Sequence, residues 1–475
     1  MNKKHIILID LPVFPKGSIT LSLPAVAAIY AGEYEVEVVD LNMLSISDFL
    51  QTVGARKNVA FWGLKVSAQN FEEAKNISAA IKKADQNQLI VWGGELPTLL
   101  PEDGLRHADT VVQSLWEPVA DEFISDLKNN RLKRIYTGDN KFELTNLLPP
   151  RFDLVRHAEQ YYSFMGLPLE TSRGCTEVCT FCMVHVMQKK NYFTKSEAQL
   201  REELKAYKGK FINIVDYNFG VSAEHVISTS RLIKESGATG WMAEMCIEFL
   251  DNDTLLAAMQ KSGCRMIYCG LESIDDKALE SVHKMNTNHI ENYERIIRKV
   301  QSYGIQIASG FILGIEGMNE RTFESTFQFF QRMGILYAKL TFLTYNPGTK
   351  VAAYMKKKGE FTTDDLSYYD GNHLSYLPHG VSAKVVAEGT ENFIRQFYSF
   401  KNIVARSFNT NLSFARQLEF ILFAYCFSDA YRQWLQEDVL RQPDNLVVLL
   451  KKQFKKSFLV YWADHLLSFI RKMNR

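Results

Sequence analysis

Cysteine is scarce in this 475-residue chain: there are seven cysteines, and none lies in the first 174 residues. An odd number, with three of them close together, argues against a framework of disulfide bonds. Long apolar runs are also absent, because none reaches the roughly 18 residues that a membrane span needs. An excess of one charge is lacking too, since 55 basic residues face 54 acidic ones. The whole chain therefore carries no charge signature of nucleic-acid binding.

The N-terminal sequence lacks the marks of a secretory signal. It begins MNKKHIILIDLP, where Asp10 interrupts the apolar run and no small-residue cleavage site follows. We interpret this segment as a first β-strand and expect a cytoplasmic protein. With 46% hydrophobic and 23% charged residues the composition is that of an ordinary globular protein, and the length predicts about three domains.

Residues 1–135 alternate between apolar, β-branched runs and helical patterns. The runs predict strands over His5–Leu11, Tyr34–Leu41, Asn58–Leu64, Gln88–Trp92 and Asp109–Val112. Continuous apolar strands separated by helices indicate a parallel sheet that is covered on both faces. The prediction is an α/β fold whose first domain is doubly wound and Rossmann-like, with ligands bound beyond the carboxyl ends of its strands.

Residues 136–165, with Pro149 and Pro150, suit a linker, and a second alternating series follows over 166–360. Its expected strands are Leu167–Ser172, Phe211–Asp216, Trp241–Ile247, Arg265–Leu271, Ile305–Gly314 and Leu336–Thr344. Six strand–helix units predict a partial (βα)6 barrel with its site at the carboxyl ends of the strands. Asn288 and Glu291 predict a capped start for one of its helices. Strand signals end near Phe361, so residues 361–475 are expected to form a helical C-terminal domain.

Cys175, Cys179 and Cys182 form a C-x3-C-x2-C segment directly after the first expected barrel strand. Three thiolates on one short loop can hold three irons of a [4Fe–4S] cluster, which leaves the fourth iron open to a small molecule. A zinc site is one alternative, with His185 as a fourth ligand, although structural zinc usually takes its ligands in two pairs. Buried cysteines without any metal are the other alternative.

Four later segments follow this loop, and together they resemble the radical S-adenosylmethionine (SAM) superfamily. Phe181, the aromatic residue before the third cysteine, belongs to the same pattern. The segments are FINIVDYNF (211–219), CGLES (269–273), GFILGIEG (310–317) and YNPGT (345–349). The resemblance implies that SAM binds the open iron through its amine and carboxylate. One-electron reduction then yields methionine and a 5′-deoxyadenosyl radical, which removes a hydrogen atom from the substrate.

The resemblance also implies where SAM is contacted. The expected contact residues are Phe181, Asp216, Asn218, Glu244, Glu272, Ser273, Gly310, Ile312 and Gly314. Asp216 and Asn218 equally fit caps on the next helix, and the two glycines also fit tight strand packing. Glu244 and Glu272 have the alternative of being solvated surface charges.

One position departs from the family pattern. Cys246 stands where relatives often carry an arginine for the SAM carboxylate, and Arg173 or Lys284 is the candidate substitute. The remaining cysteines, Cys264, Cys269 and Cys426, are expected to be small buried hydrophobic residues.

The N-terminal domain, placed before such a barrel, resembles the cobalamin-binding domain of one large subclass. The expected contacts are Lys65, Ser67, Gly93, Gly94, Trp116 and Glu117. No DxHxxG motif is present, so no histidine is expected beneath the cobalt, and the usual GEGE is replaced by QSLWE. Trp116 either stacks on the nucleotide tail of the corrin or fills the cofactor's space. A degenerate domain kept for packing or substrate docking is the alternative.

These features predict a cobalamin-dependent radical SAM methyltransferase that acts on an unactivated carbon, with methylcobalamin as methyl donor and a second SAM remethylating the cobalt. The alternatives are a radical cyclase, ring-contracting enzyme or oxidoreductase with redox-active or absent cobalamin, and a non-catalytic iron–sulfur scaffold. A small-molecule or natural-product substrate and an electron donor such as flavodoxin or ferredoxin are expected. No nucleic-acid partner is expected.

The C-terminal tail is basic and aromatic. From Arg441 to Arg475 eight basic residues stand against two acidic ones. Apolar residues at 447, 450, 454, 458 and 461 predict an amphipathic helix with four lysines mostly on its other side. Such a helix either packs on the core with a solvated face or makes peripheral contact with an anionic membrane or an acidic or amphiphilic substrate.

Overall fold

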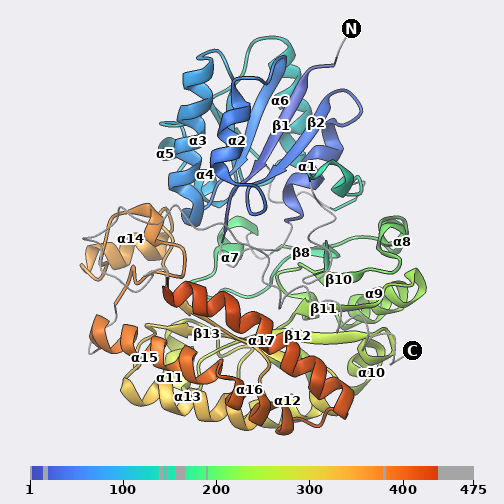
Figure 1. Ribbon diagram of the computed structural model, residues 1–475, viewed down its shortest axis with the longest axis vertical. Helices are drawn as coiled ribbons and strands as arrows, with labels where there is room; N and C mark the ends of the chain where they lie inside the picture. Colours follow the sequence, from blue (N-terminus) through green and yellow to red (C-terminus); the bar gives the residue numbers. More distant parts are fainter. Residues whose placement is uncertain are drawn as a thin grey trace.

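The computed structural model describes residues 3–13, 20–138, 144–145, 147–156, 166–188, 191–377 and 381–436. Two parallel sheets organise these residues, one above the other in Figure 1. The predicted α/β fold class, with a Rossmann-like sheet, a barrel-like sheet and a helical C-terminal region, is confirmed. None of the helices in this part of the chain has the length and hydropathy of a bilayer span.

The first sheet has six parallel strands. They are β1 (His5–Asp10), β2 (Glu35–Asp40), β3 (Val59–Lys65), β4 (Ile90–Gly93), β5 (Thr110–Gln113) and β6 (Ile135–Thr137). Their order, β2-β1-β3-β4-β5-β6, reverses direction between β1 and β3, which places a ligand crevice beyond the carboxyl ends of these two strands. Five strands were predicted, whereas the three residues of β6 are too few to carry a pattern. The domain boundaries at residues 135, 165 and 360 stay a prediction.

Helices cover this first sheet on both faces. They are α1 (Ser22–Tyr30), α2 (Ile46–Val53), α3 (Phe71–Ala84), α4 (Glu95–Leu99), α5 (Pro101–Gly104) and α6 (Ala120–Lys128). Leu8 packs toward α1 and α6, where it meets Phe123, and the next residue back, Ile7, packs toward Phe49 of α2 and Ile77 of α3. Alternate residues of one strand thus enter two separate cores, as a sheet buried on both faces requires.

The second sheet is also parallel and has six strands. They are β7 (Leu167–Leu169), β10 (Phe211–Ile214), β11 (Gly240–Glu244), β12 (Cys264–Glu272), β13 (Gln306–Leu313) and β14 (Ala338–Phe342). Their order, β14-β13-β12-β11-β10-β7, follows the chain without closing, which is the predicted partial barrel. The helices between them are α8 (Glu197–Leu204), α9 (Ala223–Ser236), α10 (Asp253–Lys261), α11 (Asp276–Ser281), α12 (Ile290–Ser302) and α13 (Glu320–Met333).

A short antiparallel ribbon interrupts the barrel after β7. It pairs β8 (Ser172–Gly174) with β9 (Tyr192–Thr194), and the cysteine segment and α7 (Met183–Gln188) lie between its two strands in sequence. Helix α7 lies between the two sheets (Figure 1). After β14 come α14 (Lys350–Lys357), α15 (Ala383–Phe397), α16 (Phe400–Phe408) and α17 (Phe414–Gln436). The predicted amphipathic tail beyond Arg441 lies outside the described residues.

Arg406 of α16 joins the C-terminal helices to the barrel. Its side chain is fully buried and donates from Nε to the backbone carbonyl of Ile335 at 3.1 Å and from Nη1 to that of Phe397 at 2.5 Å. Its guanidinium also lies 3.6 Å from the ring centroid of Phe397. Burial lowers the pKa of Arg406 to about 9. Two backbone carbonyls from different elements therefore depend on one side chain.

Replacing Arg406 with Met should lower the free energy of unfolding of the C-terminal part by about 3 kcal/mol, because two buried carbonyls lose their donors. Urea denaturation followed by circular dichroism measures the effect. Lys401→Met is the matched control, since Lys401 is exposed on the same helix and should change stability by less than about 0.5 kcal/mol. Equal midpoints for the two variants would contradict the anchoring role of Arg406.

Candidate functional site

A cavity of about 780 Å³ lies where the carboxyl ends of the two sheets face each other. Segments that follow β3, β4 and β5 line it from the first sheet, and segments at the ends of β7, β10, β11, β12 and β14 line it from the barrel. Both sheets thus use the edge at which parallel α/β folds bind ligands. The cavity belongs to neither domain alone.

Ten of the residues predicted to contact cofactors line this cavity. They are Lys65, Ser67, Gly93, Gly94, Trp116, Glu117, Phe181, Glu244, Glu272 and Ile312. Five others are not among the lining residues: Asp216, Asn218, Ser273, Gly310 and Gly314. The structure therefore brings residues predicted to contact SAM and residues predicted to contact cobalamin, from two domains, to one cavity. Some of the expected SAM contacts lie outside the cavity lining.

The cysteine segment is held at the mouth of the barrel. Thr180 donates its backbone N–H to the carbonyl of Val282 at 3.2 Å, and Cys182 donates to the carbonyl of Cys179 at 3.1 Å. Burial raises the pKa of Cys179 to about 12, and the ammonium of Lys284 opposes this rise. Among the described residues no three metal-ligating side chains are arranged around a single ion. In a [4Fe–4S] cluster each thiolate binds a different iron, so three sulfurs need not converge on one point.

Two carboxylates and a lysine lie at the ends of neighbouring barrel strands. Glu244 ends β11 and is open to the cavity, yet the protein surrounds its carboxylate closely enough that desolvation raises the pKa to about 7, with Lys339 opposing the rise. Glu272 ends β12 and lies 3.9 Å from Lys284. Burial would lower the pKa of Lys284, but Glu272 and the nearby thiols raise it above its usual range. Lys284 therefore carries its charge beside the cysteine segment.

Glu272 adopts an unusual backbone conformation, with φ of +62°. The pairing of β12 with β13 shifts register at this point, and Asn288 donates to the carbonyls of Gly270 and Leu271 at 2.9 and 3.0 Å. The predicted capping role of Asn288 is wrong, because its side chain secures the end of β12 instead and the helix begins after His289. A left-handed residue held by such contacts is typical of functional sites.

Asp216 and Asn218 serve the scaffold. Asp216 is 2% exposed and accepts hydrogen bonds from the backbone and hydroxyl of Thr171 and from the hydroxyl of Ser172 at 2.6–2.7 Å. Asn218 accepts from the backbone N–H groups of Gly220 and Cys246, each at 3.3 Å. The cap predicted for Asn218 is present, on a short 3-10 turn. Asp216 instead holds the residues just before the cysteines.

Gly310 has a packing role in the structure. A Cβ atom there would lie 2.4 Å from the hydroxyl of Tyr268, which occupies that space on the neighbouring strand. Gly94 permits another close approach: its φ is +109°, and a Cβ would lie 2.6 Å from the carbonyl oxygen of Val66. At Gly93, by contrast, no atom lies within 4 Å of the Cβ position, so its backbone faces open cavity.

Arg173 links the two domains. It forms a bidentate pair with Glu170 at 2.7 and 2.8 Å and also donates to Glu117 of the first domain at 3.0 Å. The three side chains are 11–15% exposed. The carboxylates of Glu117 and Glu170 hold the pKa of Arg173 above its usual range, against the effect of burial. Glu117 was predicted to contact cobalamin, and Arg173 was a candidate to bind the SAM carboxylate. In the structure the two side chains form an ion pair with each other.

Trp116 is fixed in the core of the first domain. Its indole N–H donates to the hydroxyl of Tyr30 at 2.9 Å, and its ring stacks near Phe61 with 6.3 Å between centroids. The edge of this aromatic group forms part of the cavity wall. No histidine is among the described residues that line the cavity. Lys65 and Gly93 line the same cavity.

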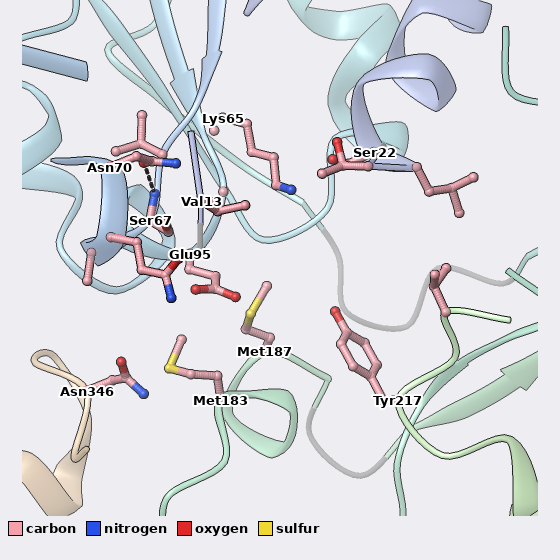
Figure 2. A pocket seen from close by; sticks show the side chains of 18 of the residues that line it. Val13, Ser22, Lys65, Ser67, Asn70, Glu95, Met183, Met187, Tyr217 and Asn346 are labelled. Atoms are coloured by element: carbon pink, nitrogen blue, oxygen red, sulfur yellow. Dashed lines mark hydrogen bonds between the residues drawn. The ribbon is translucent and has the colours of Figure 1, made fainter. Parts of the chain in front are cut away.

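Several lining residues were missed from the sequence. Met183 and Met187 stand one turn apart on α7, and Figure 2 shows both thioethers directed into the cavity, opposite Glu95. Tyr217 reaches in from the segment after β10 (Figure 2), and Val215 also lines the cavity. The segment FINIVDYNF carried no reliable signal for them, because Val215 and Tyr217 follow Ile214, the last residue of β10, and strand alternation does not extend to them.

Comparison with known proteins agrees with this geometry. Residues 169–330 match a family model described as the radical SAM superfamily. Bacteriochlorophyllide d C-12(1)-methyltransferase of Chlorobaculum tepidum is 23% identical over 346 residues, which cover 71% of this chain and 75% of that protein. The solved structure of the cobalamin-dependent SAM radical enzyme OxsB with aqua-cobalamin gives a TM-score of 0.66 at 15% identity, over 91% of this chain and 72% of that one. The methyltransferase TsrM from Kitasatospora setae, with cobalamin and a [4Fe–4S] cluster, gives 0.66 at 13% identity, over 92% and 100%.

The match to the family model covers the cysteine loop and most of the parallel barrel, so this part of the chain is similar to radical SAM domains. The relative from Chlorobaculum tepidum is named as a methyltransferase, and the two-sheet fold of this chain is similar to the folds of OxsB and TsrM.

Removing Arg173 alone from the Glu117–Arg173–Glu170 group should destabilise the protein more than replacing all three residues together. Arg173→Met leaves two carboxylates poorly solvated and should cost about 3 kcal/mol, whereas the triple variant Arg173→Met, Glu117→Gln, Glu170→Gln should recover most of this loss. Urea denaturation followed by tryptophan fluorescence measures it, since Trp116 adjoins Glu117. Arg201→Met is the control, because its pair with Glu235 is largely exposed and should contribute less than about 1 kcal/mol. A triple variant as unstable as Arg173→Met would contradict the charge explanation.

Proposed function

We propose that this enzyme methylates an unactivated carbon of a small molecule and that it uses a [4Fe–4S] cluster, SAM and cobalamin. The observation that carries the proposal is the shared cavity, because Phe181 and Met183, which flank Cys182, and the strand ends of the first sheet line the same space. A transfer between a cofactor of one domain and a radical generated in the other requires such a space. An electron donor such as flavodoxin or ferredoxin would complete the system.

The donor set fits these groups. Cys175, Cys179 and Cys182 would hold the cluster, while Glu244 and Glu272 with Ile312 would face SAM. Gly93 and Lys65, from the strand ends of the first sheet, would face cobalamin. When bound, the cluster supplies an electron that cleaves SAM, and cobalamin supplies a methyl group to the substrate carbon.

Charged side chains in and around the cavity would balance the charges of the bound groups. Lys284, kept protonated by Glu272, offsets negative charge at the cysteine segment. Glu244, with a pKa of about 7, is partly protonated at neutral pH, and a cationic amine beside it would favour its charged form. Arg173 closes the wall between the domains through Glu117, which limits access of water to the cavity at that point.

A cobalamin-free radical reaction, such as cyclisation or oxidation, is the second candidate. The ion pair of Glu117 with Arg173 favours this second candidate. Glu117 is the one residue kept from the family's GEGE pattern, and its carboxylate is then not available to a corrin. Anaerobic reconstitution with iron, sulfide and hydroxocobalamin, followed by gel filtration and absorption spectroscopy, separates the candidates. Corrin bands that stay with the protein support the methyltransferase, and cluster bands alone support the second candidate.

Changing Cys175, Cys179 or Cys182 to Ala should abolish formation of 5′-deoxyadenosine and lower the iron content, since a three-thiolate cluster has no spare ligand. Anaerobic product analysis and iron determination measure both. Cys264→Ala is the control, because Cys264 is buried in the core of the barrel and away from the cavity lining. A loop variant with normal iron and normal 5′-deoxyadenosine would contradict the cluster assignment.

Cobalamin bound here should lack a histidine ligand below the cobalt. The cavity lining offers no imidazole in the described residues, and the first domain contains only His5, on β1, and His107. His107 stacks on Trp92 in the core of that domain. The cobalt(II) electron paramagnetic resonance spectrum of the reconstituted enzyme should therefore show no nitrogen splitting from an axial histidine. Resolved splitting that disappears in His107→Phe would contradict this expectation.

A further inference from the structure

The segment after β10 divides its side chains between two environments. Asp216 and Asn218 are 2% and 1% exposed, whereas Val215 and Tyr217 are 38% and 45% exposed and line the cavity. Large apolar side chains left open in a cavity are an unfavourable arrangement unless a ligand covers them, at roughly 25 cal/mol for each Å² of apolar surface. This side of the cavity is therefore built for apolar contact.

Helix α7 extends the same apolar surface. Met183 and Met187 are separated by one helical turn, so their side chains share a face, and both project into the cavity beside Tyr217 (Figure 2). Thioethers are flexible and polarisable, and they make favourable contacts with aromatic rings. A tyrosine ring offers a flat face for stacking or edge contacts. The combination suits a flat, unsaturated surface better than a sugar or a phosphate.

The apolar surface is held rigidly to the cysteine segment from two sides. On one side α7 begins at the residue after Cys182. On the other side Asp216, between Val215 and Tyr217, bonds to Thr171 and Ser172 just before the cysteines. A molecule resting here is therefore positioned relative to the place where radical chemistry would begin.

The hydroxyl of Tyr217 adds a polar contact to this surface. Although 45% of the side chain is exposed to the cavity, the surrounding protein desolvates the hydroxyl and raises its pKa to about 12, with Glu95 and Glu170 adding to the rise. The hydroxyl therefore stays protonated and can donate a hydrogen bond. Glu95 and Asn70 of the facing domain also line the cavity. A polar group at one edge of an otherwise apolar ligand would be accommodated.

We propose that Met183, Met187, Val215 and Tyr217 form the substrate-binding wall and that the substrate presents a flat, unsaturated, apolar face to them. This assignment rests on the proposed function, since it names the substrate class for the same cavity. The alternative occupant of the wall is the corrin ring itself.

Photolabelling with 3-trifluoromethyl-3-phenyldiazirine tests the proposal. The full chain is reconstituted anaerobically with iron and sulfide, with and without hydroxocobalamin, and illuminated at increasing probe concentration. Peptide mass spectrometry should show saturable labelling of the peptides that carry Met183, Met187 and Tyr217, with cobalamin present as well as absent. The double variant Met187→Ser, Tyr217→Ser should reduce labelling of the remaining wall residues about fivefold.

Matched controls distinguish binding from simple exposure. Tyr354→Ser removes a tyrosine that is 58% exposed on α14, outside the cavity, and should leave wall labelling unchanged. Phe408 and Phe414, 65% and 71% exposed, should label without saturation. Thermal unfolding confirms that each variant folds. Saturable labelling of the wild-type protein tests binding by itself, so the test does not depend on the variants being folded.

Two results would overturn the proposal. Labelling that rises linearly and follows exposure, strongest at Phe408 and Phe414, would mean that the wall is no binding site. Loss of wall labelling when cobalamin is present would assign the wall to the corrin. Formation of 5′-deoxyadenosine in the same samples shows whether the radical chemistry is intact, so a wrong substrate class is distinguished from a wrong function.

Discussion

The contact of Arg173 with Glu117 is the interaction on which the site depends, because it fixes how the carboxyl edges of two parallel sheets face each other. Each sheet alone presents loops at one edge, as α/β folds do. Only their apposition turns these loops into an enclosed cavity with residues of both domains in its wall. The guanidinium stands two residues before Cys175 and contacts the loop that follows β5. Domain docking and the cysteine segment are thus coupled through one side chain.

Much of the fold could be predicted because the apolar runs encode it directly. A strand buried on both faces is mostly apolar, and the chain marks eleven strands clearly enough to predict. The failures are short elements. β6 and the ribbon of β8 and β9 have three residues each, and tertiary contacts rather than local pattern determine them. Asn288 shows the same limit, since its partners Gly270 and Leu271 lie on another strand.

The location of the site was also predictable, whereas the partners of its charged residues were not. The carboxyl ends of parallel strands lie at one edge of their sheet, so Glu244 and Glu272 had to share the edge of the barrel sheet and Gly93 had to lie at that of the first sheet. Whether a carboxylate at that edge is free depends on which residue of the other domain reaches it. Glu117 was assigned to a cofactor from its position in sequence, and in the structure its oxygen accepts from Arg173. No sequence pattern links positions 117 and 173.

The segment from Val215 to Asn218 explains why its polar residues, Asp216 and Asn218, were predicted to contact SAM but do not line the cavity. A buried carboxylate needs several hydrogen-bond donors, and Asp216 has three of them within the protein. Satisfied in this way, it has little capacity left for a ligand and acts through the residues it holds. Val215 and Tyr217, on either side of the buried Asp216, expose apolar surface to the cavity. In this segment, then, the polar side chains maintain the frame, and the apolar ones line the cavity.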